Sequence, residues 1–225
     1  MNNLLDELNY LKNNLNNLPM KNLSDLDLSK TELFIVDINN GFAKEGALYS
    51  PRIENLINPI VNFTKSVSND IKNIIAFTDY HTLDSIELLS YPKHCIEDTL
   101  ECEIIDELKD IKNIKIIKKN STNGFFALEN LNFENIDNII IVGDCTDICI
   151  YQLAITLKSY FNQHNINKNI IVPMNLVDTY HADKSHPAEL LNIVFLNSMI
   201  QNGIEDVKYI KYKKITISKF EMVFF

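Results

Sequence analysis

Reactive side chains of complementary kinds follow four short apolar runs in this sequence. Asp37, Asp79 and Lys119 each come within two residues of the end of such a run, and Cys145 and Cys149 follow another. A cysteine attacks a carbonyl carbon as the thiolate, a nearby lysine favours that charge, and a carboxylate can carry the proton. Brought together, these groups could hydrolyse an amide through a covalent intermediate.

The apolar runs predict a parallel sheet. They are short, rich in β-branched residues and mostly apolar on both faces, as strands buried between helices are. They occupy residues 33–36, 74–77, 114–117, 139–142 and 170–172. Helical patterns separate them, at residues 52–68, 147–161 and 187–202, and an amphipathic N-terminal helix is expected at about residues 3–18.

This alternation predicts an α/β fold with a doubly wound, mainly parallel sheet and helices on both faces. We expect a single domain over residues 1–225, because neither a linker nor an internal repeat is evident. Ligands of such sheets bind beyond the carboxyl ends of the strands. The acids, the lysine and the cysteines at those ends are therefore expected to face one crevice.

Composition narrows the function classes. The net charge is −9, which disfavours nonspecific binding to nucleic acid or to anionic membranes. No apolar run reaches the length of about 18 residues that a membrane span needs, and the N-terminus does not read as a signal peptide. Four cysteines in a chain of this size favour a cytoplasmic protein over a disulfide-stapled one.

Four motifs, in order along the chain, carry a family resemblance. They are Asp37–Leu48; Thr78–His81 with Glu87 and Tyr91–Cys95; Lys119, six residues before Phe125; and Val142–Ile150, which contains Thr-Asp-Ile-Cys. Together they resemble the nicotinamidase/isochorismatase-like cysteine hydrolases over roughly residues 33–206. The resemblance implies the isochorismatase-like hydrolase fold.

The resemblance also implies catalytic roles. Cys149 would be the nucleophile, Lys119 the cation beside it, and Asp37 the group that moves the proton. The backbone N–H groups of Cys145 and Cys149 would form the oxyanion hole, next to a cis peptide bond between Asp144 and Cys145. The Cys145 side chain is expected to be buried and to pack like alanine, although its spacing from Cys149 also allows a disulfide.

A divalent metal ion is the cofactor that the resemblance implies. Its ligands would be Asp79, His81, Glu87 and His94, with Asp84 as the alternative to Glu87. Asp79 and His81 are two residues apart, so both side chains can face the same side of an extended segment. Two imidazoles and two carboxylates suit zinc first, with manganese or iron as alternatives.

The implied activity is that of an amidohydrolase acting on a small-molecule amide. Nicotinamide, converted with water to nicotinate and ammonia, is the first expectation, with Phe42 and Tyr91 as walls for its flat ring or as ordinary core residues. Another small amide, or a carbamoyl or ureido compound, is the alternative substrate, and a non-catalytic binding protein is the third reading. We also expect a homo-oligomer, in which the apolar end 223–225 could cover a subunit edge.

Overall fold

The five apolar runs all lie within strands. The computed structural model describes residues 2–129 and 131–211, so the C-terminal segment 223–225 lies outside the described residues. The strands are β1 (Met20–Asn22), β2 (Thr31–Val36), β3 (Asn73–Asp79), β4 (Ile114–Lys119), β5 (Asn138–Asp144), β6 (Asn169–Pro173), β7 (Val177–Asp178), β8 (Glu205–Val207) and β9 (Tyr209–Lys211). The helices are α1 (Asn2–Asn16), α2 (Asn40–Ala43), α3 (Pro51–Glu54), α4 (Ile57–Val67), α5 (Asp106–Lys109), α6 (Tyr151–Gln163) and α7 (Ala188–Gln201).

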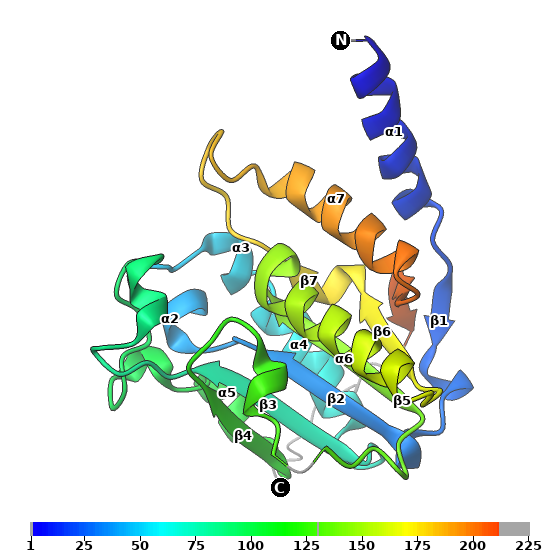
Figure 1. The fold of residues 1–225 in the computed structure, drawn as a ribbon. Helices are drawn as coiled ribbons and strands as arrows, with labels where there is room; N and C mark the ends of the chain where they lie inside the picture. The colour runs from blue at the N-terminus through cyan, green and yellow to red at the C-terminus, as the bar shows by residue number, and fades with distance from the viewer. Residues whose placement is uncertain (1, 130, 212–225) are drawn as a thin grey trace, which may run out of the picture.

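The central sheet has the order β4-β3-β2-β5-β6-β8, and β7 pairs with β5 (Figure 1). Each of these pairings is parallel. The chain starts near the middle at β2, winds to one edge through β3 and β4, and then crosses back to β5. This order, which spacing along the chain could not give, brings the ends of β2, β3, β4 and β5 side by side.

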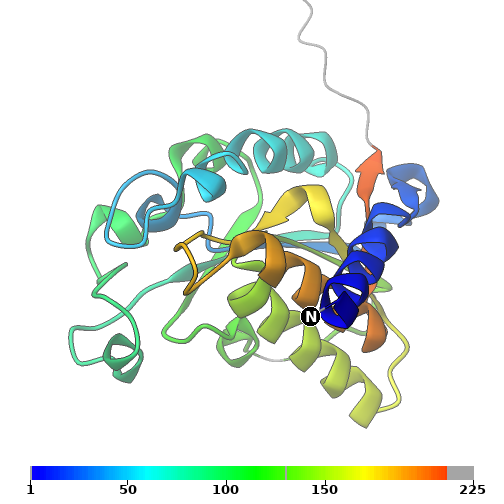
Figure 2. The same ribbon diagram turned by 90° about the horizontal axis from the view of Figure 1, so that it is seen from above.

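Side chains of alternate strand residues enter two separate cores. In β2, Leu33 and Ile35 pack with α4 and α5, while Phe34 and Val36 pack with α6 and α7. The same alternation holds in β3 and β5. Figure 2 shows the two groups of helices on opposite sides of the sheet. The expectation of a mainly parallel sheet covered on both faces is confirmed.

Three elements differ from their sequence patterns. Strand β4 is an edge strand with exposed positions, including Ile116 at 48% exposure, because no other strand of the described residues pairs with its outer side. The expected helix 52–68 is split into α3 and α4, and Pro59 stands in the first turn of α4, where its missing N–H costs no bond. Cys149 lies in a π-helical turn, Thr146–Ile150, just before α6.

The N-terminal helix is present as α1, but only its end is covered. Leu15 is buried in the core beneath α6 and α7, whereas Leu4 is 71% exposed. Figure 1 shows the first half of α1 projecting beyond the sheet and beyond α7. Within residues 2–129 and 131–211, none of the helices combines the length and the apolar character that crossing a membrane requires.

Asp206 in β8 is a buried acid that lies opposite Val172 of β6 in the strand register. It is 4% exposed, and neither carboxyl oxygen has a hydrogen-bond partner among the described residues. Burial raises the pKa of this carboxyl to about 8. The folded chain therefore holds this proton more tightly than the unfolded chain, and stability is lost as the pH rises from about 4 through about 8.

Asp206→Asn is expected to remove this pH dependence, because the amide resembles the protonated acid and does not ionise. The free energy of unfolding of the variant, relative to that of wild type, should be higher at about pH 8 than at about pH 5 by a few kcal/mol. Each pKa unit corresponds to about 1.4 kcal/mol. Urea unfolding at both pH values measures it, with the exposed Asp70→Asn as the control. A constant difference between variant and wild type at both pH values would contradict the assignment.

Candidate active site

A buried lysine joins the ends of three neighbouring strands. Lys119, the last residue of β4, lies opposite Asp79 of β3 in the strand register. Its Nζ donates a short hydrogen bond to Asp79 Oδ1 and lies 2.9 Å from Asp37 Oδ2, just beyond β2. Cys149 Sγ is 3.9 Å from the same Nζ. The structure thus brings Asp37, Lys119 and Cys149 together, in surroundings where the three side chains are almost fully buried.

Burial and charge set the protonation of this group. Burial and the charge of Asp79 together raise the pKa of Asp37 to about 7, against the opposing effect of Lys119. Burial would lower the pKa of Lys119, but Asp37 and Asp79 raise it well above its usual value. Burial also raises the pKa of the Cys149 thiol, which Lys119 partly offsets. A carboxyl group that titrates near neutral pH is suited to moving a proton there.

The neighbouring residue Lys118 provides the control for Lys119. Successive strand residues face opposite sides, and Lys118 Nζ lies 3.7 Å from the centre of the Tyr80 ring on the exposed side. Lys119→Ala is expected to cost about 3–5 kcal/mol of stability, because it leaves two buried carboxylates without their cation. Lys118→Ala should cost less than about 1 kcal/mol. Thermal unfolding measures both, and equal losses would contradict this assignment.

The turn after β5 carries both cysteines. Gly143 has φ +121°, and a Cβ there would meet the Val36 carbonyl oxygen at 2.0 Å, so only glycine lets β5 lie this close to the end of β2. The peptide bond between Asp144 and Cys145 is cis, as the family resemblance led us to expect. This turn brings Cys149 to the end of β2, where Asp37 lies.

Cys145 differs from the expectation of a buried residue that packs like alanine. It is only partly buried, and its thiol donates to Asp144 Oδ2 at 3.6 Å. The cysteine makes no disulfide with Cys149. Its side chain lines the cavity that Cys149 also lines and belongs to neither core.

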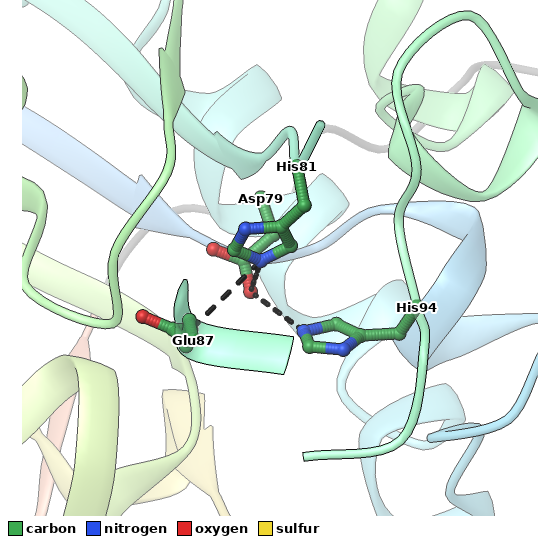
Figure 3. Close-up of side chains that lie close together, drawn as sticks. All are labelled: Asp79, His81, Glu87 and His94. Carbon is green, nitrogen blue, oxygen red and sulfur yellow. Dashed lines mark ion pairs between the residues drawn. The ribbon is translucent and has the colours of Figure 1, made fainter. Parts of the chain in front are cut away.

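Four potential metal ligands gather beside the lysine (Figure 3). Asp79, His81, Glu87 and His94 each offer one ligand atom, and these atoms all lie within 4.8 Å of one another. His81 Nε2 is 3.6 Å from Asp79 Oδ2 and 3.8 Å from Glu87 Oε1, and His94 Nε2 is 3.5 Å from Asp79 Oδ2. Ligands bound to one ion at about 2.0–2.2 Å are separated by similar distances.

The second polar atom of each ligand is held by the protein. His81 Nδ1 lies 2.9 Å from Asn120 Oδ1, and His94 Nδ1 lies 2.7 Å from the Pro92 carbonyl oxygen. Since these oxygens accept, both imidazoles carry their proton on Nδ1 and turn a free Nε2 toward the centre. Glu87 Oε2 accepts from the Thr122 N–H at 2.8 Å.

The inward atoms fit a cation. His81 Nε2 and Glu87 Oε1 are buried and have no hydrogen-bond partner within residues 2–129 and 131–211. Burial would raise the pKa of Asp79, but the neighbouring Lys119 holds it well below its usual range, so this ligand is ionised. A buried set of lone pairs aimed at one point is costly unless a cation binds there. Asp84 is exposed and accepts from Thr82 instead.

A cavity of about 500 Å³ connects these groups. Asp37 and Cys149 line the cavity, and so do three of the potential metal ligands, Asp79, Glu87 and His94. Phe42 and Tyr91 lie on its walls. The Phe42 ring centre is 5.6 Å from that of His94, and the Tyr91 ring centre is 6.2 Å from it. The space can therefore hold a small flat molecule against both the thiol and the cluster.

Sequence reasoning missed several residues of this region. Asn120 and Thr122 support two ligands, and Tyr180 and His181 add a further wall to the cavity. The position of Asn120 immediately after Lys119 was the available signal, because a residue at the same strand end must face the same crevice or its rim. No spacing in the sequence indicates Tyr180, since its loop follows the short strand β7.

The only arginine of the chain fastens two walls of the cavity. Arg52 in α3 donates from Nε to Asp178 Oδ1 at 3.2 Å and from its terminal nitrogen to the same oxygen at 2.7 Å. Asp178 belongs to β7, immediately before the loop that contains Tyr180. The two hydrogen bonds connect α3, whose Pro51 and Ile53 line the cavity, to the segment that leads to Tyr180, which also lines it.

Comparison with known proteins agrees with this fold. Nicotinamidase 1 of Arabidopsis thaliana is 25% identical over 216 residues, covering 82% of this chain and 88% of the plant protein. Pyrazinamidase of Pyrococcus horikoshii, solved in complex with zinc, has a TM-score of 0.62 at 19% identity and covers 80% of this chain and 99% of its own. N-carbamoylsarcosine amidase of Thermoplasma acidophilum has a TM-score of 0.64 at 20% identity, covering 84% and 99%.

The family itself follows from the domain match. The Isochorismatase domain matches residues 31–201, from the first residue of β2 to the last residue of α7. This range contains the whole of β2 to β7. It also contains Asp37, Lys119 and Cys149 and the four potential metal ligands described above. The domain match covers most of the chain and agrees with the fold: the chain belongs to the isochorismatase family of hydrolases.

Proposed function

We propose that this chain is a nicotinamidase that hydrolyses nicotinamide to nicotinate and ammonia through a thioester on Cys149. One observation carries the proposal: a single cavity of about 500 Å³ is lined by the Cys149 thiol, by aromatic walls and by members of a four-ligand cluster. The thiol suits the amide carbon, the walls suit a flat ring, and the cluster suits an ion that a pyridine nitrogen can bind.

The first half of the reaction forms the thioester and releases ammonia. Asp37 accepts the proton of the Cys149 thiol, and Lys119 stabilises the resulting thiolate. The sulfur attacks the amide carbon, and the oxygen of the tetrahedral intermediate accepts hydrogen bonds from the backbone N–H groups of Cys145 and Cys149. Asp37 then gives its proton to the departing nitrogen, so the C–N bond breaks and ammonia leaves.

The second half returns the enzyme to its starting state. Asp37 accepts a proton from a water molecule, whose oxygen attacks the thioester carbon. The C–S bond breaks, nicotinic acid leaves and gives its proton to the solvent to become nicotinate, and the proton held by Asp37 returns to the Cys149 sulfur. A divalent ion held by Asp79, His81, Glu87 and His94, with zinc the first expectation, would supply Lewis-acid chemistry and a binding point for the ring nitrogen.

A second candidate substrate is a carbamoyl compound. The similarity in fold to N-carbamoylsarcosine amidase favours it, because one fold can carry related amide chemistry with different pockets. Phe42 and Tyr91 argue for the ring instead, since an open-chain carbamoyl compound gains little from aromatic walls.

Ammonia release by the zinc-loaded protein separates the two candidates. The protein is given nicotinamide or N-carbamoylsarcosine at equal concentrations, with the Cys149→Ala variant as the blank. The proposal expects release from nicotinamide with much the higher kcat/KM. Release from N-carbamoylsarcosine alone would overturn it in favour of the second candidate.

A further inference from the structure

A second polar cluster lies beside the cavity and takes no part in the proposed reaction. His186, in the loop before α7, stacks on the Tyr180 ring with centres 3.7 Å apart and an angle of 13° between the planes. Its Nδ1 lies 2.9 Å from the Tyr180 carbonyl oxygen. Its Nε2 lies 2.9 Å from Asp147 Oδ2 in the turn that carries Cys149.

The two partners of this imidazole are both acceptors. The Tyr180 carbonyl can only accept, so Nδ1 must carry a proton. An ionised Asp147 also only accepts, and a neutral imidazole would then set its Nε2 lone pair against the carboxylate. The short contact therefore needs one more proton, shared between His186 Nε2 and Asp147 Oδ2. The side chains are 14% and 6% exposed, so water can replace little of this bond.

The cluster connects the nucleophile's turn to a wall of the cavity. Tyr180 lines the cavity, and Asp147 stands two residues before Cys149 in the same π-helical turn. Tyr91, Cys145 and Tyr180 line the same cavity as Cys149. The position in which His186 holds Tyr180 therefore sets the distance between this wall and the two cysteines, Cys145 and Cys149.

We propose that His186 is a positioning residue whose hydrogen bonds to the Tyr180 carbonyl and to Asp147 set the Tyr180 wall of the substrate pocket. The effect on substrate rests on the proposed function. Among titratable side chains, Asp147 and Tyr180 face the His186 ring directly. His181 of the same loop accepts from the Ala188 N–H of α7, and Asp183 and Lys184 are exposed.

Two substitutions distinguish the protonation of the His186–Asp147 pair from the hydrogen bonds of the His186 ring. Asp147→Asn lets a neutral imidazole satisfy both contacts, because the new amide can donate to Nε2 while Nδ1 donates to the Tyr180 carbonyl. His186→Phe keeps a ring to stack on Tyr180 but removes both hydrogen bonds. His164→Phe, on an exposed histidine at the end of α6, is the matched control.

The KM and kcat for nicotinamide, measured on the zinc-loaded protein at one pH, test the proposal. His186→Phe is expected to raise KM by about tenfold, the worth of one charge-assisted hydrogen bond, with kcat changed far less. Asp147→Asn, in which the ring keeps both hydrogen bonds, and His164→Phe should keep the wild-type KM. A wild-type KM in His186→Phe would overturn the proposal.

A second readout does not depend on turnover. Long-range ¹⁵N–¹H NMR spectra report which ring nitrogens carry protons, and the His186 signals are those that vanish in His186→Phe. Both nitrogens should carry a proton in the wild type, and Nδ1 alone in Asp147→Asn. Finding the proton on Nε2 alone would overturn the proposal. Absence of nicotinamide turnover, with the expected spectra, would count against the proposed function only.

Discussion

Cys149→Ala is expected to abolish ammonia release from nicotinamide, with a loss on the order of 10⁴-fold or more, because it removes the only atom that forms the thioester. The sulfur is 3.9 Å from Lys119 Nζ and lines the same cavity as Asp37. Alanine fits the same buried position, so the variant should remain folded. Steady-state ammonia release and circular dichroism measure the two effects.

Cys145→Ala is the matched control, four residues earlier in the same turn. Its thiol also lines the cavity, but the proposed mechanism uses only the backbone N–H of residue 145. We expect this variant to keep most of its activity. An active Cys149→Ala together with an inactive Cys145→Ala would reverse the assignment of the nucleophile.

His94→Ala is expected to lose zinc binding and nicotinamide turnover together. His94 Nε2 faces Asp79 Oδ2 at 3.5 Å, and its other nitrogen is held by the Pro92 carbonyl, so Nε2 is the ligand atom that alanine removes. Zinc affinity should fall by more than about 100-fold, since loss of an outer hydrogen-bond partner alone costs 10–100-fold. Competition with a chromogenic chelator measures the affinity, and ammonia release measures the turnover.

The thiol provides an internal check on this variant. Cys149 in His94→Ala should still react with iodoacetamide, because Lys119 and Asp37 do not need the metal to form the thiolate. His164 is exposed and lies far along the chain from the cluster, so His164→Ala should retain both zinc and activity. Full turnover of nicotinamide by thoroughly demetallated wild-type protein would show that the cluster is not the ring-binding site.

The strands and the residues at their ends were within reach of the sequence because both follow from local patterns. A buried parallel strand is a short apolar run, and the first polar residues after it must lie at the sheet edge. Strand alternation also separated Lys118 from Lys119 correctly, since the first is exposed over Tyr80 and the second is buried.

The rest depended on contacts between distant segments. The sequence gives no strand order, so it could not reveal that β4 is an edge strand with Ile116 exposed. The orientation of Cys145 follows from the path of the turn, and the hydrogen bond of His81 to Asn120 follows from the pairing of β3 with β4. The stack of Tyr180 on His186 joins two ends of a loop whose shape no periodicity fixes.

Acyl transfer to hydroxylamine tests the thioester on Cys149 most directly. Hydroxylamine competes with water for a thioester, so turnover of nicotinamide in its presence should yield nicotinohydroxamate at the expense of nicotinate, in a ratio that rises with its concentration. Cys149→Ala should form neither product, and Cys145→Ala should form both. Continued production of nicotinate alone at every hydroxylamine concentration would contradict a covalent intermediate and point to direct attack of water on the amide.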